Sequence, residues 1–173
     1  TEGDIIGIES HSTIKNSSAI ENTIQVTYKD FVQEVPVNST ILIDDGSIAL
    51  TVTEKQEEVL LCRVENSGTI AGKKTVNTPG IRLPLPSLTE RDIAFLAFAR
   101  EQKIDFIAHS FVRDAQDVIR VKEQLGAWSD YGKVIAKIEN QQGVENIDAI
   151  LDEAYGIMLA RGDLAVEIPA WEV

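Results

Sequence analysis

The stretch Lys133-Val134-Ile135-Ala136-Lys137-Ile138-Glu139-Asn140 decides the fold, together with its counterpart Gly156-Ile157-Met158-Leu159-Ala160-Arg161-Gly162-Asp163. Each stretch is a short apolar run that ends in charged and polar residues, which predicts a buried strand followed by a loop into a helix. In parallel α/β folds, functional groups gather where the strands end. The two stretches therefore predict a site that contains Lys137, Glu139 and Asp163.

Residues 89–173 predict alternating strands and helices, with strands at 105–111, 133–138 and 156–160. Strands that are apolar on both faces and separated by helices imply right-handed crossovers and a parallel sheet. Three such units make less than half of a (β/α)8 barrel, which needs about 250 residues. The predicted fold class is α/β, a partial TIM (β/α)8 barrel with an inserted all-β small barrel domain.

Local signals mark the ends of the predicted helices. Thr89 and Asp92 resemble a capping box, with Asp in place of Glu at the third position. Asp114 can cap the next helix, and Gly126 can end it. Apolar residues at helical spacing predict the buried helix faces: Ile93, Leu96, Ala97, Val118, Val121, Leu125, Val144, Ile147, Ile150 and Leu151.

Residues 1–75 predict a small all-β barrel domain, because short β-rich runs alternate there with turn signals. Asp44-Asp45-Gly46 predicts a hairpin, since Gly supplies the positive φ of a tight turn. From Leu50 to Thr53, apolar and polar residues alternate as in a half-exposed strand. Prolines at 79, 84 and 86 indicate an extended linker. We place the domain boundary between residues 75 and 76, so that 76–173 form the second domain.

Composition excludes several classes of protein. The 173 residues carry a net charge of −12 and no basic stripe, which argues against nucleic acids and anionic membranes as partners. No apolar run approaches the roughly 18 residues of a membrane span. The single Cys62 excludes an internal disulfide, predicts a buried thiol and fits a cytoplasmic location. Because the chain starts at Thr1 without Met, we expect a piece of a longer protein.

The predicted site has a definite chemistry. Lys137 and Glu139 are two residues apart, so they point to the same side of a strand. Glu139 and Asp163 supply hard oxygen ligands of the kind that Mg²⁺ or Mn²⁺ takes. Lys137 can offset the charge of an oxyanion or a phosphoryl group. At Gly162, backbone N–H groups can approach an anion. The alternative is a surface Lys–Glu pair beside an ordinary capped loop.

Four motifs carry a resemblance to a known family: Lys73-Lys74-Thr75-Val76-Asn77-Thr78-Pro79-Gly80, Ser110-Phe111-Val112-Arg113, Lys137-Ile138-Glu139-Asn140 and Gly156-Ile157-Met158-Leu159-Ala160-Arg161-Gly162-Asp163-Leu164. Residues 73–173 resemble pyruvate kinase, and residues 1–72 look like most of its β lid domain. Pyruvate kinases transfer phosphate from phosphoenolpyruvate to ADP, giving pyruvate and ATP in glycolysis. Where the family usually has Gly, this chain has Thr75, and where it usually has Ala, this chain has His109.

The resemblance implies a role for each matching residue. Lys137 corresponds to the catalytic lysine, and Glu139 and Asp163 correspond to the ligands of Mg²⁺ or Mn²⁺. Lys74, with Asp44 or Asp45, corresponds to the nucleotide side. The substrate-binding residues that it implies are Ser110, Ala160, Arg161, Gly162 and Asp163.

The resemblance also implies K⁺ as a second cofactor, with its ligands outside this chain, and a cytoplasmic, homotetrameric parent. We expect the piece by itself to be inactive and to self-associate through open strand edges. Arg113 is expected to form a structural salt bridge, and His109 to face away from Ser110. The alternatives are a metal-dependent phosphoenolpyruvate/pyruvate aldolase or mutase, and a non-catalytic binding module.

Overall fold

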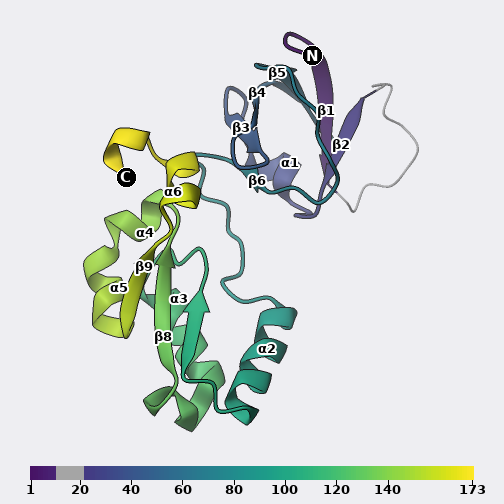
Figure 1. The fold of residues 1–173 in the computed structure, drawn as a ribbon. Coiled ribbons are helices and arrows are strands. Elements are labelled where there is room, and N and C mark those ends of the chain that lie inside the picture. The colour runs from purple at the N-terminus through teal and green to yellow at the C-terminus, as the bar shows by residue number, and fades with distance from the viewer. Residues whose placement is uncertain (11–21) are drawn as a thin grey trace. The chain divides into compact units, whose positions relative to one another are not determined.

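The computed structural model describes residues 1–10 and 22–173. They form two compact units, Thr1–Leu83 and Pro84–Val173, which we call unit 1 and unit 2. Unit 1 consists mainly of strands, whereas unit 2 alternates strands and helices (Figure 1). The chain is therefore a mixed α/β protein.

Unit 1 contains a six-stranded sheet in the order β2-β1-β5-β4-β3-β6. Neighbouring strands are antiparallel, except β1 and β2, which are parallel. One short helix, α1, packs against this sheet and contributes two buried residues to its core. The elements are β1 (Ile5–Ser10), β2 (Thr23–Val26), α1 (Phe31–Glu34), β3 (Thr40–Ile43), β4 (Ile48–Lys55), β5 (Val59–Val64) and β6 (Val76–Asn77).

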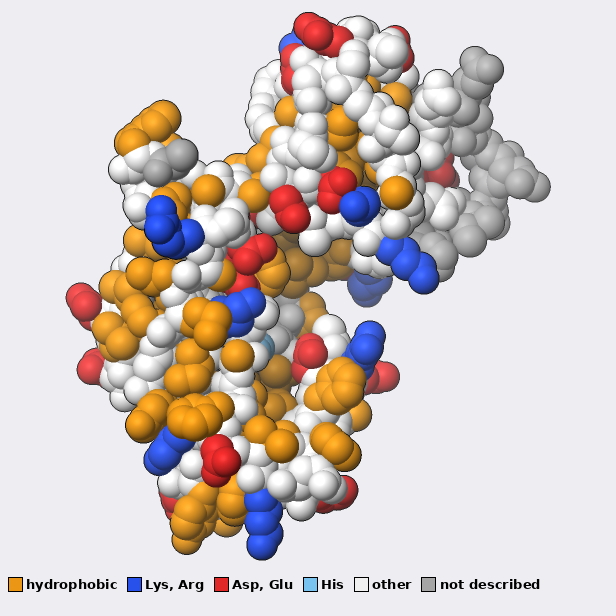
Figure 2. Space-filling model, viewed as in Figure 1, with side chains coloured by type: hydrophobic (Ala, Val, Ile, Leu, Met, Phe, Trp, Pro, Cys, Tyr) orange, Lys and Arg blue, Asp and Glu red, His pale blue; other side chains and the backbone are white. Residues whose placement is uncertain are grey.

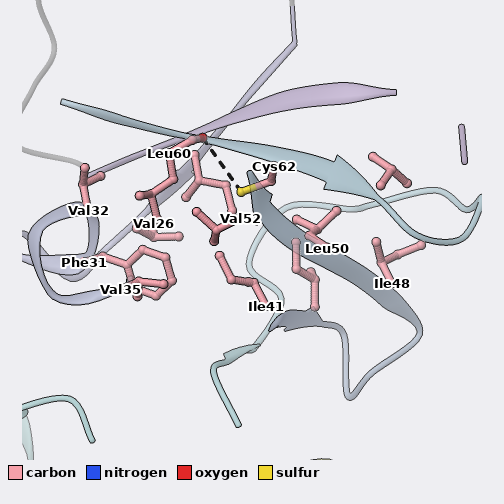
Figure 3. Packing of buried hydrophobic residues seen from close by; sticks show 13 residues of the cluster. Val26, Phe31, Val32, Val35, Ile41, Ile48, Leu50, Val52, Leu60 and Cys62 are labelled. Carbon is pink, nitrogen blue, oxygen red and sulfur yellow. Dashed lines mark hydrogen bonds between the residues drawn. The ribbon is translucent and has the colours of Figure 1, made fainter. Parts of the chain in front are cut away.

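Alternation along the strands of unit 1 builds its core. In β4, Ile48, Leu50 and Val52 are buried while Ala49 and Thr51 are partly exposed, so the predicted half-exposed strand is confirmed. Figure 3 shows the buried side chains of β4 in one core with Phe31 and Val32 of α1 and with Leu60 and Cys62 of β5. Burial raises the pKa of the Cys62 thiol to about 12, which leaves it an unreactive core residue, as predicted.

The predicted hairpin lies between β3 and β4. Asp44, Asp45 and Gly46 have φ of 54°, 55° and 85°, three left-handed residues in a row. A left-handed conformation is higher in free energy for a residue with a side chain than for glycine. The two aspartates are among the residue types that tolerate them best.

Unit 1 extends beyond the boundary that the sequence predicts between residues 75 and 76. Val76 and Asn77 form β6 and pair with Ile43 and Leu42 of β3. Leu83 packs against the unit 1 core. The prolines at 84 and 86 then follow in a stretch without regular structure.

Unit 2 contains a three-stranded sheet in the order β7-β8-β9, with both pairings parallel, as the sequence predicts. The predicted strand at 133–138 is confirmed residue by residue, while the other two strands are shorter than predicted. The elements are α2 (Glu90–Glu101), β7 (Phe106–His109), α3 (Ala115–Leu125), η2 (Gly126–Asp130), β8 (Lys133–Ile138), α4 (Gln141–Glu145), α5 (Ile147–Glu153), β9 (Gly156–Leu159), α6 (Arg161–Glu167) and η3 (Ala170–Glu172), where η marks a 3-10 helix.

The predicted helix caps are confirmed. Thr89 and Asp92 form a reciprocal capping box at the start of α2. The Asp114 carboxylate accepts a hydrogen bond from the Asp117 N–H at the start of α3. Gly126 ends α3 with a φ of 57°. These ends were predictable because each depends on residues within four positions of it.

Two predicted helix faces differ from the structure. The third helix is interrupted at Asn146, which separates α4 from α5, and it buries Ile150 while leaving Val144 and Leu151 exposed. In α2, Leu96 is buried but Ile93 is exposed. Periodicity identifies the apolar residues of a helix, but only a neighbouring element can cover them.

Among the described residues, no helix combines the length and the apolar character that a membrane span requires.

Candidate active site

The ends of β7 and β8 bring Lys137, Glu139 and Ser110 together. The Lys137 ammonium forms an ion pair with the Glu139 carboxylate, so the two side chains lie on the same side of the chain, as predicted. The same ammonium donates a hydrogen bond of 3.1 Å to the Ser110 hydroxyl. The Lys137 side chain is 24% exposed and that of Glu139 only 1%. The lysine can therefore reach a bound anion, whereas the glutamate lies almost entirely below the surface.

The second Glu139 oxygen accepts a hydrogen bond of 2.7 Å from the backbone N–H of Phe111. Phe111 has a φ of 54°, a left-handed conformation that is uncommon for a residue with a large side chain. Both oxygens of the buried carboxylate thus have donors, and an ionised carboxylate of this kind avoids the cost of an unpaired buried charge.

Ala160 to Asp163 lie at the end of β9, the strand that pairs with β8. Ile138 pairs with Leu159 in parallel register, and the Ala160 N–H donates to the Ile138 carbonyl at 3.3 Å. The next residues form the first turn of α6, in which Gly162 and Asp163 are exposed. Because parallel strands end at one edge of the sheet, this turn lies at the same edge as Glu139.

The side chains at this edge supply some, but not all, of the oxygen ligands that a hard divalent cation needs. Glu139 and Asp163 offer carboxylate oxygens, and each carboxylate has about four lone-pair sites, so Glu139 keeps capacity beyond its two present donors. No group of three or more His, Cys, Asp or Glu side chains within the described residues could hold a metal ion by itself. Water and substrate would have to complete the coordination, which is how proteins usually hold Mg²⁺.

His109 is the last residue of β7 and is half-buried. Burial lowers the pKa of its imidazole, and the charges of Asp117 on α3 and Asp92 on α2 oppose that effect. Ser110, the next residue, contacts Lys137 instead. The charge of Glu139 also acts on His109, and the expectation that His109 faces away from Ser110 stays a prediction.

The nucleotide-side residues predicted from the sequence lie in unit 1. Lys74 forms an ion pair of 2.9 Å with Asp44. The Thr75 hydroxyl donates to the Asp45 carboxylate at 2.8 Å and accepts from the Asp45 N–H at 3.4 Å. Asp44 is thus the aspartate beside Lys74, while Asp45 is held by the Thr75 hydroxyl.

Comparison with known proteins shows which family this chain is similar to. The family described as pyruvate kinase, barrel domain, matches residues 1–173. The chain belongs to the pyruvate kinase family.

Relatives in this family come from distant organisms. The pyruvate kinase of Borreliella burgdorferi is 50% identical over 153 residues, which cover 88% of this chain and 32% of that protein. The pyruvate kinase of Bacillus licheniformis is 50% identical over 153 residues, covering 87% of this chain and 26% of the relative. Human pyruvate kinase PKLR is 46% identical over 152 residues, covering 88% and 26%. The chain thus spans about a third or less of the length of these relatives.

Some features of the site were not predicted. The left-handed conformation of Phe111 and the bond of the Asn140 amide to the Val112 carbonyl carry no local signal in the sequence. The partners of Asp117 stand at helical spacing from it, which is a local signal. The Asp117 carboxylate, 1% exposed, forms ion pairs with Arg113 and Arg120. Arg113 is therefore a structural salt-bridge residue, as predicted. Asn140 had a detectable signal, since Asn three residues before Gly143 fits a helix cap.

Proposed function

We propose that this chain supplies part of the active site of an enzyme that transfers the phosphoryl group of phosphoenolpyruvate to ADP, giving pyruvate and ATP. The observation that carries the proposal is the cluster of Lys137, Glu139 and Ser110 at the strand ends of unit 2. In the whole protein, residues 76–173 would belong to a (β/α)8 barrel and residues 1–75 to an inserted β domain. We expect the enzyme to be cytoplasmic and homotetrameric.

Lys137 is the proposed catalytic residue. Its ammonium would offset negative charge on the transferring phosphoryl group and on the oxygen that the group leaves. Ser110 and Glu139 hold the ammonium in place before substrate arrives. Because phosphoryl transfer depends mainly on positioning and charge neutralisation, a fixed lysine is an effective contribution.

Glu139 and Asp163 are the proposed ligands of Mg²⁺ or Mn²⁺. A bound divalent cation would supply positive charge to the substrate oxygens and orient them. The backbone of residues 160–163, with Asp163 and Ser110, would bind the carboxylate and phosphate ends of the substrate. A Cβ atom added to Gly162 would meet nothing within 4 Å, so space for a ligand exists beside this turn. K⁺, the second cofactor, would take ligands from outside this chain.

Lys74 and Asp45 are the proposed nucleotide-binding residues. Lys74 would bind ADP or ATP phosphates, which compete with Asp44 for its ammonium. Phosphate oxygens are strong partners for lysine, so this exchange replaces one ion pair by another.

The proposed metal site is tested by titrating Mn²⁺ into the chain and measuring binding, with Glu139→Gln plus Asp163→Asn as the matched control. We expect saturable binding that the double substitution abolishes. Equal binding by both proteins would contradict the proposed ligands. We expect no turnover of phosphoenolpyruvate and ADP by the chain itself, and metal-dependent turnover that Lys137→Met removes would contradict that expectation.

We also expect the chain to self-associate. Hydrophobic side chains cover much of the surface of unit 2 (Figure 2), among them Phe95, Phe98, Phe106 and Leu159. Exposed apolar patches of this kind favour association. A single monomeric species in sedimentation over a wide concentration range would contradict this.

A further inference from the structure

The segment 111–113 connects β7 to α3. The Val112 side chain is buried in the core of unit 2, the Arg113 side chain pairs with Asp117, and the backbone of all three residues makes hydrogen bonds. The Phe111 N–H donates to Glu139, and the Val112 N–H donates to the Lys137 carbonyl at 3.3 Å. The Val112 carbonyl accepts from the Asn140 amide at 3.2 Å. The Arg113 carbonyl accepts from the Asn146 amide at 2.9 Å. These partners come from the end of β8 and from the start and end of α4.

Phe111 needs this support because of its conformation. A non-glycine residue at a φ of 54° costs on the order of 1–3 kcal/mol and persists only when its surroundings hold it. Phe111 is 49% exposed, so packing of its own side chain supplies little of the support. Hydrogen bonds of the Phe111 and Val112 backbone hold this conformation together with the buried Val112 side chain.

Asn140 connects this segment to the helix that follows β8. Its side-chain oxygen accepts from the Gly143 N–H at 2.8 Å and caps α4, while its amide nitrogen donates to the Val112 carbonyl. A Cβ atom at Gly143 would lie 2.6 Å from the same carbonyl oxygen. The first residues of α4 therefore pack closely against the Val112 carbonyl.

We propose that Asn140 is a positioning residue for the metal ligand Glu139, acting through Val112 and the N–H of Phe111. Asn140 holds the Val112 carbonyl, which keeps Phe111 in its left-handed conformation and directs the Phe111 N–H at one Glu139 oxygen. With Lys137 on the other oxygen, the carboxylate cannot rotate, and its remaining lone pairs keep fixed directions for a divalent cation. This inference rests on the proposed function, because it names Glu139 as a metal ligand.

Two substitutions separate this role from helix capping. In Asn140→Ser, the hydroxyl still caps α4, since Ser is a favourable cap, but the donor to Val112 is lost. In Asn140→Asp, the cap and the shape remain, and a carboxylate oxygen faces the Val112 carbonyl. The Asp variant is examined without metal only, because its added charge attracts cations directly.

Asn66→Ser is the matched control. Asn66 makes the same two kinds of hydrogen bond within unit 1, donating to the Ser47 carbonyl and accepting from the Ala49 N–H, each at 2.8 Å. The substitution removes an equivalent bridge from a different unit.

The measurements are the Mn²⁺ dissociation constant, the melting temperature and the amide resonance of Phe111 in the metal-free chain. We expect Asn140→Ser to weaken Mn²⁺ binding about 10-fold, the low end for residues that orient a metal ligand. We expect the Phe111 amide proton to move upfield in both Asn140 variants, with little change in melting temperature. Asn66→Ser should change neither the Phe111 resonance nor the Mn²⁺ affinity.

An unchanged Phe111 resonance in both variants would overturn the inference, as would an unchanged Mn²⁺ affinity in Asn140→Ser after the resonance has moved. If the unsubstituted chain binds no Mn²⁺, the proposed metal site fails. The Phe111 resonance then decides by itself whether Asn140 positions Glu139.

Discussion

Unit 1 closes a hydrophobic core within itself, whereas unit 2 leaves much of its apolar surface open. In the described part of unit 1, the large hydrophobic residues that remain exposed are Ile5, Val37 and Ile70. In unit 2, helix and strand residues such as Phe98, 57% exposed, and Phe106, 58% exposed, face solvent. The two units have similar lengths, so size does not explain the difference.

Strand connectivity explains it. The antiparallel strands β3, β4 and β5 of unit 1 follow one another along the chain and pair directly, so a short segment covers itself. Parallel strands need a long crossover connection, in unit 2 a helix each time, and each added strand exposes a new edge and a new face. A three-stranded parallel sheet therefore needs further elements before its apolar surface is covered.

Substitution of one leucine in each unit gives the largest expected difference. Leu50→Ala in the unit 1 core, where Leu50 is fully buried, should cost about 3 kcal/mol of unfolding free energy. Leu159→Ala in unit 2, where Leu159 is 55% exposed, should change stability by less than about 0.5 kcal/mol. In denaturant unfolding, tryptophan fluorescence reports on unit 2 separately from unit 1, because both tryptophans, Trp128 and Trp171, belong to unit 2. A loss at Leu159 as large as that at Leu50 would mean that this face is covered in solution.

Substitution of Asp117, one of the two buried carboxylates described in unit 2, gives the next largest effect. Burial by itself raises the pKa of Asp117, but hydrogen bonds from the Arg113 side chain and N–H outweigh it, so the pKa is lowered. Asp117→Asn should cost about 2 kcal/mol at neutral pH, less than a fully buried pair because both arginines are partly exposed.

The pH dependence of stability checks this explanation. A carboxylate with a lowered folded-state pKa contributes stability above its unfolded pKa of about 3.9, and this contribution is lost as pH falls through the folded value. The unsubstituted unit 2 should lose stability below about pH 4, and Asp117→Asn should reduce that loss. An identical acid profile for both proteins would show that Asp117 is not its source.

Gly143→Ala tests how tightly the start of α4 packs against the Val112 carbonyl. The added methyl group would lie 2.6 Å from the Val112 carbonyl oxygen, and we expect a loss of about 1.5 kcal/mol from the forced displacement. Gly156→Ala is the control in the same unit, since its Cβ would make ordinary contact with Ile135 at 3.7 Å. Equal losses of unfolding free energy in Gly143→Ala and Gly156→Ala would mean that the Val112 carbonyl can move away from the added methyl group.

Thr75→Val tests the polar turn of unit 1 and should have the smallest effect. The variant keeps the shape of Thr75 but loses its two hydrogen bonds with Asp45, an exposed interaction that we expect to contribute about 0.5 kcal/mol. Amide hydrogen exchange at Asp45 should become faster. Thr53→Val, which removes a hydroxyl bonded to the Leu61 carbonyl, should leave that exchange rate unchanged.

The residues of β8 and the ends of α2 and α3 illustrate what could be predicted. The apolar run from Lys133 to Ile138 is bounded by Gly132 and Glu139, and the strand occupies those positions. Thr89 and Asp114 cap helices through contacts with residues three positions away. The pairing of Lys137 with Glu139 also follows from spacing along one strand.

The sequence by itself therefore determined the strand β8, the caps of α2 and α3, the parallel order of the strands in unit 2 and the side chains that follow them, because periodicity and capping act over a few neighbouring residues. Only the tertiary structure decided that Phe111 adopts a left-handed conformation, that Asn140 bonds to Val112 and that Val144 and Leu151 stay exposed. Phe111 and Glu139 are separated by 28 positions, and their contact depends on the register between β7 and β8. Register and the covering of a helix face are set by long-range packing, which no local pattern specifies.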